Sequence, residues 1–389
     1  MSELNLDLID TTSELAALCQ SLRQRDYIAI DTEFIRDKTF WPKLCLIQLG
    51  AGGEARAVDA MADGLDLTPL YDLLDDASVI KVFHAARQDV EIFVHTSGRV
   101  PHPIFDTQVA AMVCGFGDSV GYDKLAARLA NAHIDKASQY TDWARRPLTK
   151  NQIGYALADV LYLQTIYENL HGQLEKSSRS SWLDEEMATL TNPSTYKLHP
   201  EDAWKRLKIR SRNKEYLGII AELAAWREER AQTKDMPRNH VLRDEAIQEL
   251  AAERPRSIEA LQRLRAVPKG LAKNSVGKSI IEAVQRGRKM PKDQLPEFKP
   301  REMQPKGLGP TVELLKVLLK YQCEHHDVSQ KLIASVADLE KLAGNGGDDL
   351  PLLQGWRRQI FGKDALDLMA GKLSLTLADK AIKVVRNDR

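Results

Sequence analysis

The sequence predicts an α/β domain followed by two all-α helical-bundle domains, with boundaries at 1–195, 209–292 and 305–389. Short apolar runs alternate with helical periodicity up to about residue 195, whereas only the helical period recurs after residue 200. A chain of 389 residues is also too long for one typical domain. The order of strands and helices in the first domain favours a mixed sheet covered by helices.

The formal charge is unevenly divided along the chain. Residues 1–200 contain 18 Lys or Arg and 28 Asp or Glu, a balance of −10, whereas residues 201–389 contain 37 and 27, a balance of +10. An acidic half suits a metal site, and a basic half suits a polyanion such as nucleic acid. The alternative is two solvated surfaces of opposite charge.

Composition excludes several classes of protein. The four cysteines, Cys19, Cys45, Cys114 and Cys323, form no C-x-x-C pair, so neither a disulfide framework nor a zinc site is predicted. Reduced thiols favour a cytoplasmic location. The first ten residues lack the basic and apolar regions of a signal peptide. No uncharged apolar stretch reaches about 18 residues, so we expect no membrane span.

Local patterns predict each element of the first domain. Leu15, Leu18 and Leu22 recur at helical spacing behind Thr12, a candidate N-cap. Apolar runs bounded by turn residues predict strands, and two of them flank a glycine-rich turn typical of an antiparallel hairpin. The predicted elements are a helix at 12–24, strands at 27–30, 44–49 and 55–58, a helix at 67–74, and strands at 79–83 and 104–105.

Two carboxylates, Asp31 and Glu33, stand at the end of the first predicted strand. Residues i and i+2 of a strand lie on the same face, so both acids point the same way. Two like charges side by side are unfavourable unless a cation lies between them, and Mg²⁺ prefers carboxylate oxygens. The alternative for so short a motif is an acidic turn after a strand.

Further acids follow later predicted elements. Asp89 falls in the first turn of a helix after the strand at 79–83, where a carboxylate could equally serve the helix dipole. Asp106 is interpreted as the N-cap of the next helix. Tyr155 and Asp159 are four residues apart on a helix beginning at Lys150, so they share one face.

Taken together, these motifs resemble the DEDD exonuclease superfamily in its tyrosine branch, and most closely the ribonuclease D family. The resemblance covers about residues 5 to 195 and rests on five ordered motifs. They are Asp31-Thr32-Glu33-Phe34, the stretch from Phe83 to Asp89, Phe105-Asp106-Thr107-Gln108, Trp143-x-x-Arg146-Pro147-Leu148, and Gln152-x-x-Tyr155-Ala156-x-x-Asp159-Val160.

The resemblance implies a ribonuclease H-like fold with a five-stranded mixed sheet. It implies hydrolysis from a free 3′-OH end, with release of nucleoside 5′-monophosphates. Asp31, Glu33, Asp89 and Asp159 could then hold two divalent ions, Mg²⁺ or Mn²⁺, roughly 4 Å apart. Tyr155 would orient or deprotonate the attacking water, although a phenol titrates near pH 10.

Four neighbouring residues are candidate substrate contacts. His84 could touch a phosphate or ribose, or be a hydrogen-bonded structural histidine. Phe34 could wedge against the terminal base, or lie in the core. Thr32 flanks the acids and Gln88 precedes Asp89.

A succession of short predicted helices follows residue 201 and contains Ala225-Trp226-Arg227 and the later Pro237 and Val241. This pattern resembles the helicase-and-RNase-D C-terminal (HRDC) domain, a helical bundle that binds nucleic acid, and residues 305–389 are predicted to be a second, diverged copy. Gly277-Lys278-Ser279 looks like the end of a P-loop, but Ala272 stands where a glycine is needed and no strand precedes it. We therefore expect no ATP binding.

The resemblance thus implies a 3′→5′ exoribonuclease that trims structured small RNAs with 3′ tails, with tRNA precursors as the leading substrate. One alternative is a 3′→5′ DNA exonuclease using the same residues. A second is a nucleic-acid-binding scaffold with a decayed site, which the presence of all four acids and the tyrosine argues against.

Overall fold

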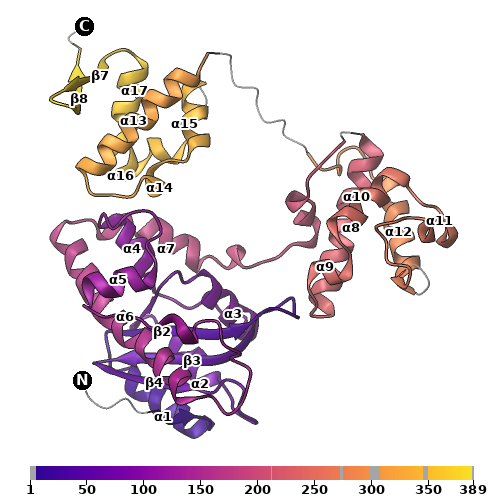
Figure 1. Ribbon diagram of the computed structural model, residues 1–389, viewed down its shortest axis with the longest axis horizontal. Helices are drawn as coiled ribbons and strands as arrows, with labels where there is room; N and C mark the ends of the chain where they lie inside the picture. Colours follow the sequence, from indigo (N-terminus) through magenta and orange to yellow (C-terminus); the bar gives the residue numbers. More distant parts are fainter. Residues whose placement is uncertain (1–5, 212, 272–274, 298–306, 345–348, 388–389) are drawn as a thin grey trace. The chain divides into compact units, whose positions relative to one another are not determined.

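The structure is a computed structural model that describes residues 6–211, 213–271, 275–297, 307–344 and 349–387 (Figure 1). The chain forms two compact units. The first contains Met1–Glu33, Cys45–Thr195 and Glu302–Arg389, and the second contains Phe34–Leu44 and Tyr196–Arg301. Each unit is described by itself.

The first unit is built on a mixed six-stranded sheet in the order β1-β4-β3-β2-β5-β6. Its strands are β1 (Leu8–Ile9), β2 (Tyr27–Ile35), β3 (Lys43–Ala51), β4 (Glu54–Val58), β5 (Ile80–Phe83) and β6 (Ile104–Asp106). β3 and β4 form the predicted antiparallel hairpin, and β2, β5 and β6 run parallel. The α/β prediction is confirmed, but the count of five strands is wrong. The added strand β1 has only two residues, too few for a sequence pattern.

Helices cover this sheet. They are α1 (Thr12–Leu22), α2 (Thr68–Leu74), α3 (Arg87–Ser97), α4 (Thr107–Val113), α5 (Tyr122–Leu129), α6 (Lys150–Lys176) and α7 (Asp184–Thr191). Helix α6 packs against β4 and β5, and α4 and α5 pack against α6 (Figure 1). A capping box of Thr149 and Gln152 starts α6. Thr11, rather than the predicted Thr12, caps α1 by accepting from the Glu14 amide.

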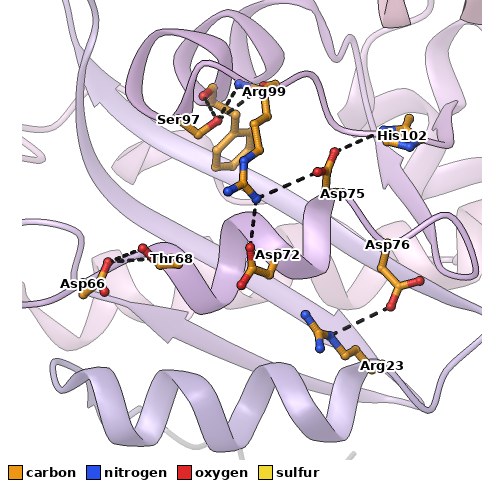
Figure 2. A network of polar contacts seen from close by, with 10 residues as sticks. Arg23, Asp66, Thr68, Asp72, Asp75, Asp76, Ser97, Arg99 and His102 are labelled. Atoms are coloured by element: carbon orange, nitrogen blue, oxygen red, sulfur yellow. Dashed lines mark hydrogen bonds and ion pairs between the residues drawn. The ribbon is translucent and has the colours of Figure 1, made fainter.

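Ion pairs on the surface of this unit join α2 to the segment after α3. Arg99 lies 2.8 Å from Asp72 and 3.8 Å from Asp75, and His102 lies 3.5 Å from Asp75 (Figure 2). The side chains of these residues are about half exposed. Exposed pairs contribute little to stability, so the buried sheet core, rather than this network, holds the domain together.

The first unit also contains the C-terminal helices. They are α13 (Gly309–His325), α14 (Gln330–Ile333), α15 (Val336–Ala343), α16 (Gly355–Arg357) and α17 (Lys363–Met369). The all-α prediction is wrong at the end of this segment, where β7 (Leu373–Ala378) and β8 (Ala381–Arg386) form an antiparallel hairpin. Asp379 and Lys380 both have positive φ, the conformation of a two-residue hairpin turn. Neither residue is glycine, so the sequence lacks the usual signal.

The second unit is a helical bundle. Its helices are α8 (Lys214–Thr233), α9 (Arg238–Val241), α10 (Asp244–Glu253), α11 (Ile258–Gln262) and α12 (Ser275–Lys289), preceded by a 3-10 helix, η4 (Pro200–Arg206). Helices α8 and α12 meet at Gly218 and Gly287, where a Cβ on Gly218 would lie 2.1 Å from the Gly287 carbonyl oxygen. Only glycine permits this close approach of two backbones.

Within the part of the chain that the structure describes, no helix is both long enough and apolar enough to cross a bilayer. All four cysteines are free thiols.

Candidate active site

Three carboxylates converge beside β2, which continues to Ile35 rather than ending before Asp31 as predicted. Asp31 and Glu33 project from β2, and Asp159 projects from α6. One oxygen of each lies within 4.8 Å of the others. The i and i+2 spacing on the strand brings Asp31 and Glu33 to one side, and the packing of α6 on the sheet supplies the third acid.

The fourth acid, Asp89, lies outside this group of three carboxylates and is tied to β2 by a buried hydrogen bond. It lies in the first turn of α3, which follows β5, the parallel neighbour of β2. The Thr32 hydroxyl donates to Asp89 Oδ1 at 2.5 Å. Thr32 stands between Asp31 and Glu33, so this bond ties Asp89 to the strand that carries the other acids.

The acids raise one another's pKa. Burial and then the charge of Asp159 raise the pKa of Asp31 well above its usual range. Burial, together with the three other acids, raises the pKa of Glu33 to about 10. Burial raises the pKa of Asp159 to about 7, although its hydrogen bond from Tyr155 opposes the change. Loss of hydration at all three carboxylates, together with the repulsion that acts on Asp31 and Glu33, indicates a site for a cation.

Tyr155 stands one helical turn before Asp159 and shares its face, as the spacing predicts. Burial and the charges of Asp159, Glu33 and Asp31 raise the pKa of this phenol well above its usual range. Its ring centroid lies 6.3 Å from that of the buried Trp143. In this setting the hydroxyl keeps its proton at neutral pH and acts as a hydrogen-bond donor.

The donor set fits divalent cations. Carboxylate oxygens are the ligands that Mg²⁺ and Mn²⁺ prefer. Asp159 Oδ1 is buried without a hydrogen-bond partner among the described residues, which leaves an acceptor available to a metal ion. Asp31, Glu33 and Asp159 could hold one ion directly, and Asp89 is the candidate fourth ligand.

The four candidate substrate contacts lie in different settings. Thr32 is buried and engaged with Asp89, so its hydroxyl serves an acid of the site. His84 Nδ1 lies 3.0 Å from the Thr107 hydroxyl, which supports the structural interpretation. Phe34 is partly buried and continues β2, while Gln88 is exposed on α3. Contact of these residues with a substrate stays a prediction.

Two supporting groups escaped the sequence reasoning. The Tyr122 hydroxyl donates to the Asp159 backbone carbonyl from α5, a contact that no local spacing signals. Asp106, predicted only as a helix cap, does accept from the Gln108 amide. It also accepts from the amides of Ala85 and Ala86 at 3.0 and 2.9 Å. Asp106 therefore fixes the turn that leads into α3 and Asp89.

Arg146, the arginine of the Trp-x-x-Arg-Pro motif, has a structural role. Its Nε and Nη2 donate to the two Asp59 carboxylate oxygens at 2.7 and 2.6 Å. It also donates to the backbone carbonyls of Cys45 and Trp143 at 2.8 and 2.7 Å. This guanidinium therefore fastens the segment before α6, which carries Trp143, to strand β3.

Comparisons with known proteins agree with this geometry. Residues 6–175 match the family described as 3′-5′ exonuclease, and residues 217–284 match the HRDC domain. The chain is 47% identical to ribonuclease D of Nitrobacter hamburgensis over 384 residues, covering 99% of this chain and all of that one. It is also 47% identical to ribonuclease D of Gluconacetobacter diazotrophicus, covering 97% of this chain and 96% of that one.

The crystal structure of Escherichia coli RNase D, an exoribonuclease involved in structured RNA processing, matches with a TM-score of 0.81 and 31% identity. The match covers 95% of this chain and 99% of that one. The exonuclease fold and the acid cluster imply divalent metal ions as cofactors. The chain belongs to the ribonuclease D family and is a 3′→5′ exoribonuclease.

Proposed function

We propose that the protein removes nucleotides one at a time from the 3′ ends of structured small RNAs, with tRNA precursors as the leading substrate, and releases nucleoside 5′-monophosphates. Asp31, Glu33, Asp89 and Asp159 would hold two divalent ions, Mg²⁺ or Mn²⁺. When bound, such ions supply a nucleophile at neutral pH and stabilise charge on the leaving 3′-oxygen. The observation that carries the proposal is the convergence of three carboxylates within 4.8 Å, with Asp89 held beside them.

Tyr155 would orient the attacking water by hydrogen bonding. Its pKa is raised by burial and by three neighbouring acids, which disfavours a role as a base. Its hydroxyl can donate to Asp159 or accept from a water beside it. Tyr122, which donates to the Asp159 carbonyl, would keep the backbone of α6 in place during this step.

The basic charge of the C-terminal half and its HRDC match support an RNA substrate. Residues 201–389 carry a balance of +10, and the matched HRDC region lies within them. We propose a catalytic domain at 1–195, a first HRDC-like domain at 209–292 and a second, diverged one at 305–389. The helical domains would hold the RNA body. Four free thiols suit the reducing cytoplasm, where we propose that the protein acts.

The test is a digestion of a 3′-extended tRNA and a matched DNA strand, each labelled at its 5′ end, with Mg²⁺ or Mn²⁺. We expect a one-nucleotide ladder on the RNA that is absent in EDTA and for Asp31→Asn. A ladder on DNA alone would replace the RNA proposal with a DNA exonuclease. Tight binding without cleavage of either strand would leave a scaffold.

A further inference from the structure

The second unit contains a basic pocket. We call it the Arg36 pocket. It has a volume of about 340 Å³, and its lining includes four arginines. The lining residues that matter here are Arg36, Thr39, Arg206, Arg227, Arg238 and Asp244. Arg36 and Thr39 come from the β2–β3 loop, only a few residues beyond Glu33 in the chain, and the others come from the helical bundle.

The β2–β3 loop is built into the bundle. Phe40 is a member of its buried core, and the backbone amides of Phe40 and Trp41 donate to Asp235 Oδ1 at 3.0 and 2.9 Å. The Arg238 guanidinium lies 4.5 Å from the centre of the Phe40 ring. Arg36 Nε donates to the Phe40 carbonyl at 3.0 Å. The pocket wall is therefore fixed by packing and hydrogen bonds from both segments.

Two acids pair with three of the arginines that line the pocket. Glu228, whose side chain is 2% exposed, accepts two hydrogen bonds from Arg238 and a third from Arg206 at 3.2 Å. Asp244 accepts from Arg227 at 2.6 Å. The pocket lining therefore contains four arginines and one acid, Asp244.

We propose that the Arg36 pocket binds a backbone phosphate of the RNA substrate. Guanidinium groups bind phosphate oxygens through paired, charge-assisted hydrogen bonds, and a fixed concave site gives these bonds their geometry. Arg206 is half exposed and makes the longest of the three bonds to Glu228, so it can turn toward a phosphate while Arg238 keeps Glu228 paired. This inference rests on the RNA-directed function proposed above.

Two separate segments of the chain, the β2–β3 loop and the helical bundle, line the Arg36 pocket. A phosphate bound here would contact the loop that continues from the strand of the catalytic acids and also contact the HRDC-like bundle. A bundle expressed without this loop would lack Arg36 and Thr39. The proposal therefore distinguishes a composite site from general attraction by a basic surface.

The experiment measures binding of the full chain to an RNA hairpin with a single-stranded 3′ tail, by fluorescence anisotropy in EDTA over a series of salt concentrations. Arg36→Gln and Arg206→Gln should each weaken binding by about threefold to tenfold. Each should also lower the slope of log Kd against log salt by about one. Asn239→Glu, at an exposed residue of the pocket lining, should weaken binding without removing any of the ion pairs described above.

Arg286→Gln is the matched control, because Arg286 lies in the same bundle, pairs with Glu222 at 2.8 Å and is outside the pocket lining. It should weaken binding by less than twofold. Thermal unfolding of every variant checks that the bundle stays folded.

The outcomes separate the two proposals. The pocket proposal would be overturned if Arg286→Gln weakened RNA binding as much as the pocket variants did, or if all three pocket variants bound RNA like wild type. In either case, a one-nucleotide ladder produced by wild type on the same RNA would still support the exonuclease proposal. The absence of any ladder with wild type would refute the proposed function itself.

Discussion

The Thr32 hydroxyl donates a hydrogen bond to Asp89 Oδ1, and both side chains are buried. The two residues are 57 positions apart, yet this bond joins the strand of Asp31 and Glu33 to the helix of Asp89. A hydrogen bond to the ionised form of a carboxyl group opposes the rise in pKa that burial causes. Thr32 therefore helps Asp89 remain available as a metal ligand.

Thr32→Val should lower the exonuclease rate by about tenfold to a hundredfold, as expected when a group that orients a metal ligand is lost. It should also raise the Mg²⁺ concentration needed for half-maximal rate, because Asp89 would bind its proton more tightly. Thr32→Ser, which keeps the hydroxyl, should restore most of both. Steady-state assays over a Mg²⁺ series check this. A wild-type rate and Mg²⁺ dependence in Thr32→Val would show that this hydrogen bond does not support the site.

Metal binding should release protons, and its affinity should rise with pH. In the metal-free site burial raises the pKa of Asp159 to about 7 and, with neighbouring acids, that of Glu33 to about 10, so these groups hold protons near neutral pH. Metal ligands must be ionised, so raising the pH from about 6 to about 8 should tighten Mg²⁺ binding. Calorimetric titrations in two buffers of different ionisation enthalpy should give different heats. Identical heats and a constant affinity would contradict the prediction.

Asp159→Asn should stabilise the metal-free protein while abolishing its activity. A carboxyl group whose pKa is raised on folding loses its proton first in the unfolded chain. Stability therefore falls as pH rises from the ordinary value of 3.8 toward about 7. At pH 8 in EDTA the variant should be more stable by on the order of 2 kcal/mol. Mg²⁺ should raise the melting temperature of wild type more than that of the variant. The exposed Asp63→Asn is the control, and no gain in stability over this control would refute the argument that burial of Asp159 is costly.

Contacts between residues close together in the sequence could be predicted, whereas contacts between distant residues could not. The Asp31–Glu33 pair follows from the period of a strand, and the Tyr155–Asp159 pair follows from the period of a helix, so both could be expected from local spacing. The partner of Thr32 could not, because it depends on how β5 and α3 pack beside β2. The same limit explains the contact of Tyr122 with the Asp159 carbonyl, which joins residues 37 positions apart.

Short elements mark the other limit of sequence reasoning. Strand β1 consists of two residues and is defined only by its pairing with β4. The β7–β8 hairpin turns at Asp379 and Lys380, which lack the glycine that usually signals such a turn. Strand β1 was therefore too short to predict, and the β7–β8 hairpin lacked the expected turn residues. The long helix α6, in contrast, could be predicted from the spacing of its apolar residues.

Arg146→Lys should reduce both stability and activity. Lysine keeps the charge but cannot donate to both Asp59 oxygens and to the carbonyls of Cys45 and Trp143 at once. We expect a loss of about 1–3 kcal/mol in unfolding free energy, as for charge-assisted hydrogen bonds that are partly buried. Urea unfolding measures this loss.

A double-mutant cycle tests whether Arg146 acts through Asp59. Arg146→Lys and Asp59→Asn should be less costly together than the sum of their separate effects, since each breaks the same pair. The exposed neighbour Arg145→Lys is the matched control and should behave like wild type. Additive effects would assign the role of Arg146 to its backbone contacts instead.

The C-terminal helices should detach from the catalytic domain when their ion-pair anchor is removed. The side chain of Arg357 is 7% exposed and donates to Glu185 and Glu186 of α7, while the ring of Trp356 stacks on Trp182 with centroids 4.3 Å apart. Replacing both acids with glutamine leaves a buried guanidinium without its counter-charges, which costs about 3–5 kcal/mol.

We expect Glu185→Gln with Glu186→Gln to make helix α7 and the C-terminal helices more accessible to limited proteolysis. The double variant should also unfold in two thermal transitions. Glu175→Gln, which removes an exposed partner of His171, is the control and should change neither. A single transition and unchanged proteolysis in the double variant would mean that other contacts hold the two parts together, including the stacked tryptophans and the hydrogen bond from Lys331 to Ser119.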